Sequence, residues 1–160
     1  MSLSCDRAGC PVRVQKVVLM RHAVAQHNMP GSDIKSPALF DPPLLAQGKI
    51  EAVQAGERVR AWWRDHTRND GVDLIVVSPL TRCIQTATLA FLPGDDYNSL
   101  KAPEMVCAED VREACGIHYP DKQRQKSLLQ VGSYINGAQL LYESSDSSLL
   151  SPETLEACVV

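Results

Sequence analysis

The stretch Val17-Val18-Leu19-Met20-Arg21-His22-Ala23 places four consecutive apolar residues directly before an Arg-His pair. Such a run, with two β-branched valines, predicts a short strand that is covered on both faces. Open α/β sheets carry their chemistry beyond the carboxyl ends of such strands. We therefore expect Arg21 and His22 to lie where a buried strand meets a functional loop.

Helical and strand patterns alternate after this stretch. Residues 45–66 have small and apolar residues at the three- and four-residue spacing of one helix face, and residues 73–77 and 105–107 predict two more strands. Ser78 and Pro79 predict the start of a second helix, with the serine as cap and the proline at the first helical position. This order of elements is typical of an α/β fold with a parallel sheet.

The second predicted helix has an apolar stripe formed by Leu80, Ile84, Ala87 and Phe91. Arg82 falls off this stripe, so periodicity alone predicts that its side chain faces solvent. Its position in the first turn is nevertheless one where a positive side chain and a helix N-terminus together attract an anion.

The composition restricts the class of protein. The chain has 160 residues, a net charge of −3 and six cysteines, so we expect one domain with no nucleic-acid groove and no anionic membrane surface as its partner. Its apolar runs are too short to span a bilayer. Six cysteines in a chain of this length, without a signal-like stretch, indicate reduced thiols and a cytoplasmic location.

A zinc site is a competing interpretation of the N-terminal region. Cys5, Cys10, His22 and His27 have a spacing close to that of a zinc finger. A finger needs both histidines on one helix, which the strand pattern before His22 disfavours. A cysteine-dependent phosphatase is excluded because no cysteine has an arginine six positions later. We expect neither a metal nor a cofactor.

Four segments in this order resemble the histidine phosphatase superfamily, also called phosphoglycerate mutase-like, and suggest its eukaryotic, phosphatase-like branch. The resemblance covers about residues 16–126 and implies a partial three-layer α/β sandwich, with a mostly parallel sheet flanked by helices. The segments are Arg21-His22-Ala23 with His27-Asn28, Asp41-Pro42-Pro43-Leu44 with Gly48, Ser78-Pro79-Leu80-Thr81-Arg82 with Gln85-Thr86-Ala87, and Arg112-Glu113-Ala114-Cys115-Gly116.

The resemblance implies hydrolysis of a phosphomonoester through a phosphohistidine, with a phosphorylated small molecule as substrate. In this scheme His22 attacks phosphorus and Glu113 protonates the leaving group. The phosphoryl oxygens are bound by Arg21, Asn28 and Arg82. These residue types suit the roles, because imidazole is nucleophilic near neutral pH and guanidinium groups bind phosphate bidentately. For His27, a role in ordering the site and a plain loop position both stay open.

The chain departs from the family after about residue 126. The second catalytic histidine that the resemblance implies is not found, so we expect the C-terminal part of the fold to be missing and the middle of the sheet to lack a strand. We divide the chain into an N-terminal tail (1–15), an incomplete histidine phosphatase-like domain (16–126) and a diverged, poorly ordered tail (127–160). The alternative function is an inactive, truncated remnant that binds phosphorylated ligands or a partner.

Overall fold

The computed structural model describes residues 16–66, 72–92, 103–114, 116–125, 140–142 and 157–159. Its helices are α1 (Ala46–His66) and α2 (Thr81–Phe91). One sheet has the strand order β1-β5-β2-β3-β4, and its four pairings are all parallel. The protein is therefore an α/β protein with a small parallel sheet. The strands are β1 (Val17–Leu19), β2 (Leu74–Val77), β3 (Glu104–Cys107), β4 (Leu140–Tyr142) and β5 (Ala157–Val159).

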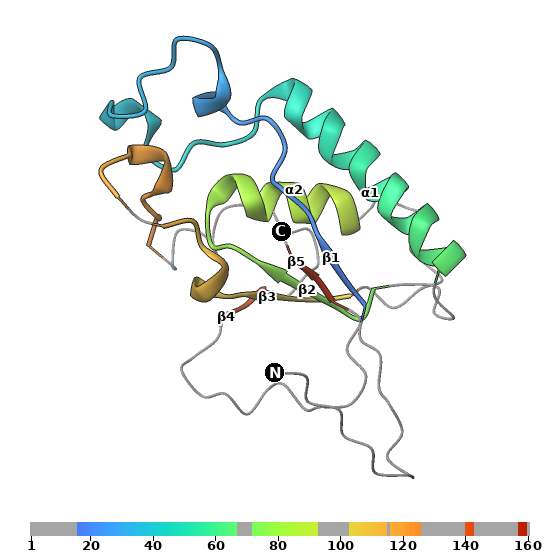
Figure 1. Ribbon diagram of the computed structural model, residues 1–160. Coiled ribbons are helices and arrows are strands. Elements are labelled where there is room, and N and C mark those ends of the chain that lie inside the picture. The colour runs from blue at the N-terminus through green and yellow to red at the C-terminus, as the bar shows by residue number, and fades with distance from the viewer. Residues whose placement is uncertain are drawn as a thin grey trace, which may run out of the picture.

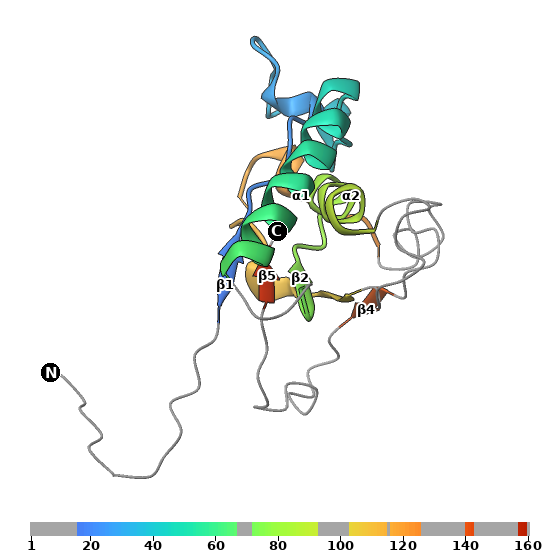
Figure 2. The ribbon, with the colours of Figure 1, turned by 90° about the vertical axis from the view of Figure 1, so that its right-hand side faces the viewer.

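The two helices pack side by side over one face of the sheet, as Figures 1 and 2 show from two directions. They approach closely at Gly56 of α1, where a Cβ atom would lie 2.2 Å from the carbonyl oxygen of Ala90 in α2. Only a residue without a side chain permits this approach. The described residues thus form two of the three layers that the resemblance implied.

The core lies between α2 and the central strands β2 and β3. The helix contributes the predicted stripe, and all four of its residues are buried, which confirms that prediction. Each such large apolar side chain contributes about 1.5–3 kcal/mol of transfer free energy on burial. The facing residues of the sheet are Ile75, Val77, Met105 and Cys107.

The first strand differs from its prediction. Among the described strands β1 pairs with β5 alone and therefore lies at an edge of the sheet. Val17 is 55% exposed and Leu19 is 79% exposed, whereas Val18 packs against the core. The prediction of a strand covered on both faces is wrong within the described residues, because α1 lies on one side of this edge strand only.

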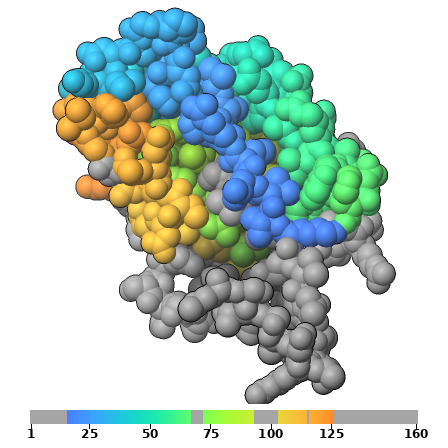
Figure 3. Space-filling view, viewed as in Figure 1, coloured from blue at the N-terminus to red at the C-terminus, as the bar shows by residue number. Residues whose placement is uncertain are grey.

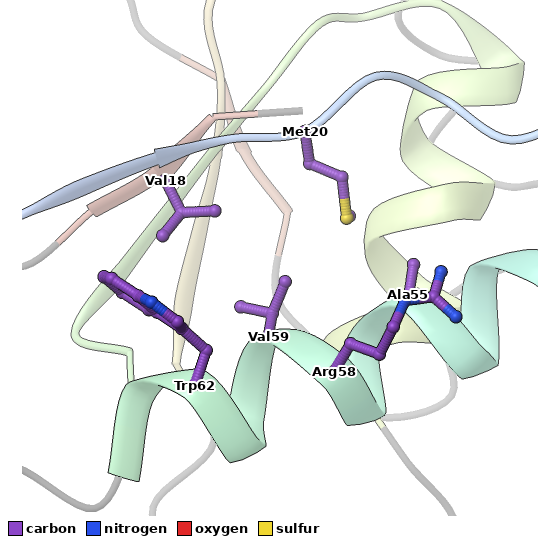
Figure 4. A pocket seen from close by; sticks show the side chains of 6 residues that line it. All are labelled: Val18, Met20, Ala55, Arg58, Val59 and Trp62. Atoms are coloured by element: carbon purple, nitrogen blue, oxygen red, sulfur yellow. The ribbon is translucent and has the colours of Figure 1, made fainter. Parts of the chain in front are cut away.

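An apolar cavity of about 330 Å³ lies between β1 and α1. Figure 4 shows Val18 and Met20 on the strand side, facing Val59 and Trp62 of the helix. Ala55 and Arg58 complete its lining. The edge strand and the helix are thus separated by apolar space at this point.

Strand β5 occupies the middle of the sheet. It pairs with β1 on one side and with β2 on the other. The expectation that the middle of the sheet lacks a strand is therefore wrong. The sequence analysis predicted neither β5 nor β4, because each has three residues and provides too short a pattern to recognise. The division at residues 15 and 126 stays a prediction.

The described residues were expected to hold neither a metal site nor a membrane-spanning segment, and the structure bears only on those residues. Among the described residues no group of three or more His, Cys, Asp or Glu side chains could hold a metal ion, and Cys5 and Cys10 lie outside those residues. No helix in the described ranges is long and apolar enough to cross a membrane.

Candidate active site

The N-terminus of α2 is capped from a distant part of the chain. α2 begins at Thr81 after Leu80, so the prediction that Ser78 caps it is wrong. Asp41 instead accepts hydrogen bonds from the Thr81 N–H at 2.8 Å and from the Thr81 hydroxyl at 2.5 Å. Asp41 is fully buried and has a φ of 43°, a backbone region that Asp adopts more readily than most residues. A buried carboxyl group thus holds the first turn; burial raises its pKa, which the hydrogen bonds from Thr81 and the charge of Arg124 oppose.

The loop after β1 is attached to α2 through polar side chains. The N–H of Ala23 donates to Thr86 Oγ1 at 3.1 Å, and this hydroxyl donates to the carbonyl of Arg82 at 2.8 Å. The N–H of Leu44 donates to Gln85 Oε1 at 2.8 Å, and Leu44 forms a bridge with Ala25. Buried side chains of α2 therefore place the residues that flank His22.

Arg82 is fully buried, so the prediction of a solvent-facing side chain is wrong. Its Nη1 donates to the carbonyl of Pro120 at 2.5 Å. Its Nη2 lies 3.1 Å from Glu113 Oε2 and 3.2 Å from Asp121 Oδ1. Periodicity could not indicate this burial, because both carboxylates come from a segment more than 30 residues further along the chain. Among the described residues the buried Arg82 Nε–H has no hydrogen-bond partner.

His22 is partly buried, and its ring orientation is defined by one hydrogen bond. Nδ1 lies 2.8 Å from the carbonyl oxygen of Ala23, which can only accept, so Nδ1 carries the proton of the neutral ring. Burial lowers the pKa of His22 below 6.5; the hydrogen bond to Ala23 opposes this, and the positive charges of Arg82 and Arg21 lower the pKa further. The Nε2 lone pair is therefore available near neutral pH.

A second histidine lies beside the first. The ring centroids of His22 and His27 are 5.6 Å apart. Burial, and then the charge of Arg82, lowers the pKa of His27 to about 4. Asn28 is exposed and uses its amide within the loop, where Oδ1 accepts from the Ala25 N–H at 2.9 Å and Nδ2 lies 3.1 Å from His27 Nε2. The phosphate-binding role expected of Asn28 stays a prediction, and so does that of the exposed Arg21.

The segment that carries Glu113 borders the site on its other side. In Figure 3, α2 is visible between the blue loop that follows β1 and the yellow-to-orange residues 103–125. The N–H of Asp41 donates to the Tyr119 carbonyl at 3.4 Å, and Arg124 Nε lies 3.2 Å from Asp41 Oδ2. The side chain of Glu113 is 64% exposed, so its carboxylate reaches both solvent and Arg82.

The structure brings several sequence-predicted residues together. Arg82 contacts Glu113 directly, and the charges of Arg82, Arg21 and Glu113 all act on His22. The sequence analysis included Asp41, Gln85 and Thr86 in the segments that carry the resemblance but gave none of them an individual role, and it did not single out Asp121. One signal could have identified part of this set, because α2 carries polar residues at positions 81, 82, 85 and 86, which form a second buried face beside the apolar stripe.

These features define an α/β protein with a site of histidine, arginine and carboxylate side chains, where the loop after its first strand meets the N-terminus of a helix. The sequence model of the histidine phosphatase superfamily (branch 1) matches residues 17–101. The chain belongs to this superfamily. The matched region includes His22, Asn28 and Arg82, whereas Glu113 lies outside it.

Two Arabidopsis thaliana proteins are similar to the chain. One, described as phosphoglycerate mutase-like protein 1, is 26% identical over 88% of this chain and 54% of its own length. The other, described as phosphoglycerate mutase-like protein, is 30% identical over 70% of this chain and 49% of its own length. The chain therefore spans about half the length of these relatives.

A solved structure is also similar, that of the putative phosphohistidine phosphatase SixA from Agrobacterium tumefaciens. It is 19% identical to the chain, with a TM-score of 0.41 over 80% of this chain and 67% of its own.

Proposed function

We propose that this protein hydrolyses a phosphomonoester through a phosphohistidine at His22. The observation that carries the proposal is the orientation of the His22 ring. Its Nδ1 lies 2.8 Å from the Ala23 carbonyl oxygen, so the neutral ring has its lone pair on Nε2, and the charge of the buried Arg82 helps to lower the pKa of His22. A neutral nucleophile beside a fixed positive charge suits attack on a phosphate ester, because the cation stabilises the charge on the equatorial oxygens in the transition state.

The proposed reaction has two steps. In the first, His22 Nε2 forms a bond to phosphorus while the bond from phosphorus to the ester oxygen breaks, and the carboxylic acid form of Glu113 gives its proton to the leaving alkoxide. In the second, water attacks the phosphohistidine, the P–N bond breaks, and Glu113 takes a proton from the water. The role of Glu113 comes from the family resemblance. Its contact with Arg82 supports the role, since the carboxyl lies 3.1 Å from the arginine that we propose as a phosphate ligand.

Arg82 keeps hydrogen-bonding capacity for a phosphoryl group. Glu113 and Asp121 share its Nη2, and Pro120 accepts from Nη1, which leaves Nε–H without a partner among the described residues. An incoming phosphoryl oxygen competes with Glu113 for the guanidinium. Because Glu113 is mostly exposed, it can leave this ion pair and reach the leaving oxygen. Asp121 is mostly buried and continues to hold Arg82.

A phosphatase is favoured over a mutase for this chain, because a mutase must protect its phosphohistidine from water and no segment of the sequence is recognisably specialised for that task.

The substrate that we propose is a phosphorylated small molecule. The cytoplasmic location stays a prediction from the cysteine content.

The second candidate function is binding of a phosphorylated ligand without turnover, with activity reduced or lost. It is favoured by the departure of the sequence from the family pattern after about residue 126, where the second catalytic histidine that the resemblance implies is not found.

Hydrolysis of an aryl phosphate by the full chain tests the proposal. We expect His22→Ala to abolish turnover and Arg82→Ala to lower it by about 10²-fold or more, as for loss of one preorganised transition-state donor. His66→Ala is the control, because this histidine lies at the end of α1. Turnover that survives His22→Ala contradicts the proposal. Phosphate binding that requires Arg82, in a wild-type protein without turnover, supports the second candidate instead.

A further inference from the structure

The ring of His27 contains a buried nitrogen that the proposed reaction does not use. Its Nδ1 has no hydrogen-bond partner among the described residues. Buried polar atoms of proteins are nearly always paired, so an unpaired one beside a site is a candidate partner for a bound group. The ring that carries it lies 5.6 Å from the ring of His22, centroid to centroid.

The hydrogen bonds around Asn28 fix which His27 nitrogen carries the proton. The backbone N–H of Ala25 can only donate, so the Asn28 atom 2.9 Å from it is the amide oxygen. The other end of the amide is then the NH₂ group, and it donates to His27 Nε2 at 3.1 Å. A nitrogen that accepts carries no proton in the neutral ring, so the proton is on Nδ1.

The surroundings of His27 keep its ring neutral. Burial lowers its pKa to about 4, and the charge of Arg82 and the neighbouring His22 contribute in the same direction. At pH 7 the ring therefore holds one proton, and the unpaired Nδ1 is a donor.

We propose that the Nδ1–H of His27 donates a hydrogen bond to the phosphoryl group bound at His22, which makes His27 a phosphate ligand. This inference rests on the proposed function. A phosphoryl group offers three acceptor oxygens, and the unpaired Arg82 Nε–H and His27 Nδ1–H are two buried donors near His22. The His27 ring lies 5.6 Å from that of His22, centroid to centroid, and the charge of Arg82 acts on His22. A neutral donor binds phosphate without adding a charge that would lower the nucleophilicity of His22. Asn28 is then a positioning residue that fixes the His27 tautomer.

Two substitutions separate donation to phosphate from simple support of the loop. The amide nitrogen of asparagine lies near the place of a histidine Nδ1, so His27→Asn keeps a donor there but loses the contact with Asn28. The longer glutamine places its amide near Nε2, so His27→Gln keeps a partner for Asn28 and loses the donor. His66→Gln, on α1, is the control.

The readout is the affinity of each variant of the full chain for orthophosphate, measured by isothermal titration calorimetry. We expect His27→Gln to weaken binding by about tenfold or more, as for loss of a hydrogen bond to a charged group, and His27→Asn to weaken it clearly less. Equal losses in both variants, a larger loss in His27→Asn, or no loss in either would overturn the inference. Wild-type protein that does not bind orthophosphate contradicts the proposed function itself.

Nitrogen-15 NMR of the histidine rings provides a test without ligand. In the free protein at pH 7 we expect the His27 proton on Nδ1, and addition of orthophosphate should shift the Nδ1 resonance. A proton on Nε2 overturns the inference even if His22 and Arg82 bind phosphate as proposed.

Discussion

Substitution of Asp41 by alanine tests the long-range cap of α2. The change removes the acceptor of the Thr81 N–H, which as a helix cap contributes about 1 kcal/mol. It also removes the charged acceptor of the Thr81 hydroxyl, a hydrogen bond worth about 1.5–3 kcal/mol. The ion pair with Arg124 adds less than about 1 kcal/mol, because the arginine side chain is 41% exposed and solvent screens its charge. For the three interactions together, we expect Asp41→Ala to lower the free energy of unfolding by about 3 kcal/mol.

Urea unfolding followed by circular dichroism measures this loss, which corresponds to a fall in Tm of about 6–12 °C for a domain of this size. Asp41→Asn is the matched control. It keeps an acceptor oxygen and the tolerance of the left-handed backbone at position 41, so we expect it to lose about 1 kcal/mol. A loss below about 1 kcal/mol for Asp41→Ala, or equal losses for both variants, refutes the assignment of Asp41 as the cap.

Three further predictions concern packing and pH. Gly56→Ala should lower the free energy of unfolding by about 1–3 kcal/mol, because the added Cβ meets the backbone of Ala90. The control Gly116→Ala, whose Cβ meets nothing within 4 Å, should change it little, and equal effects in a urea titration would show that the helices do not approach here. The pKa of His27 is about 4 in the folded protein and near 6.5 in the unfolded chain, so between these pH values the unfolded chain binds more protons. The free energy of unfolding should therefore fall as the pH falls from 6.5 to 4, and it should fall less in His27→Gln. Identical pH profiles of the two proteins would contradict the lowered pKa. The rate of phosphohistidine formation should decrease in acid with a midpoint below pH 6.5. Arg21→Gln should move that midpoint to higher pH, because the charge of Arg21 lowers the pKa of His22. An unmoved midpoint would place Arg21 away from the nucleophile.

Local patterns predicted the elements that carry most of the site. The apolar run before Arg21 indicated β1, and residues 45–66 indicated α1, which the structure has at Ala46–His66. Both patterns depend on neighbours within a few positions along the chain, and such information is present in the sequence itself. The same holds for the buried apolar stripe of α2.

Apart from the missed short strands β4 and β5, the errors concern long-range partners. Ser78 matched the local rule for a helix cap, but the carboxylate of Asp41, about 40 residues earlier, is the stronger acceptor. The burial of Arg82 depends on Glu113 and Asp121, whose arrangement no helical periodicity encodes. Whether β1 is buried on both faces depends on its place in the strand order. The structure shows β5 between β1 and β2, which leaves β1 at the edge of the sheet.

The measurement that tests the central claim most directly is the location of a covalently bound phosphoryl group. The full chain is mixed with a ³²P-labelled phosphomonoester, quenched in alkali, and mapped by proteolysis and mass spectrometry. We predict a label that is stable in alkali, labile in acid, carried by residue 22, and absent from His22→Ala. A label of the same amount in His22→Ala, or one carried by another residue, would contradict the assignment of His22 as the nucleophile.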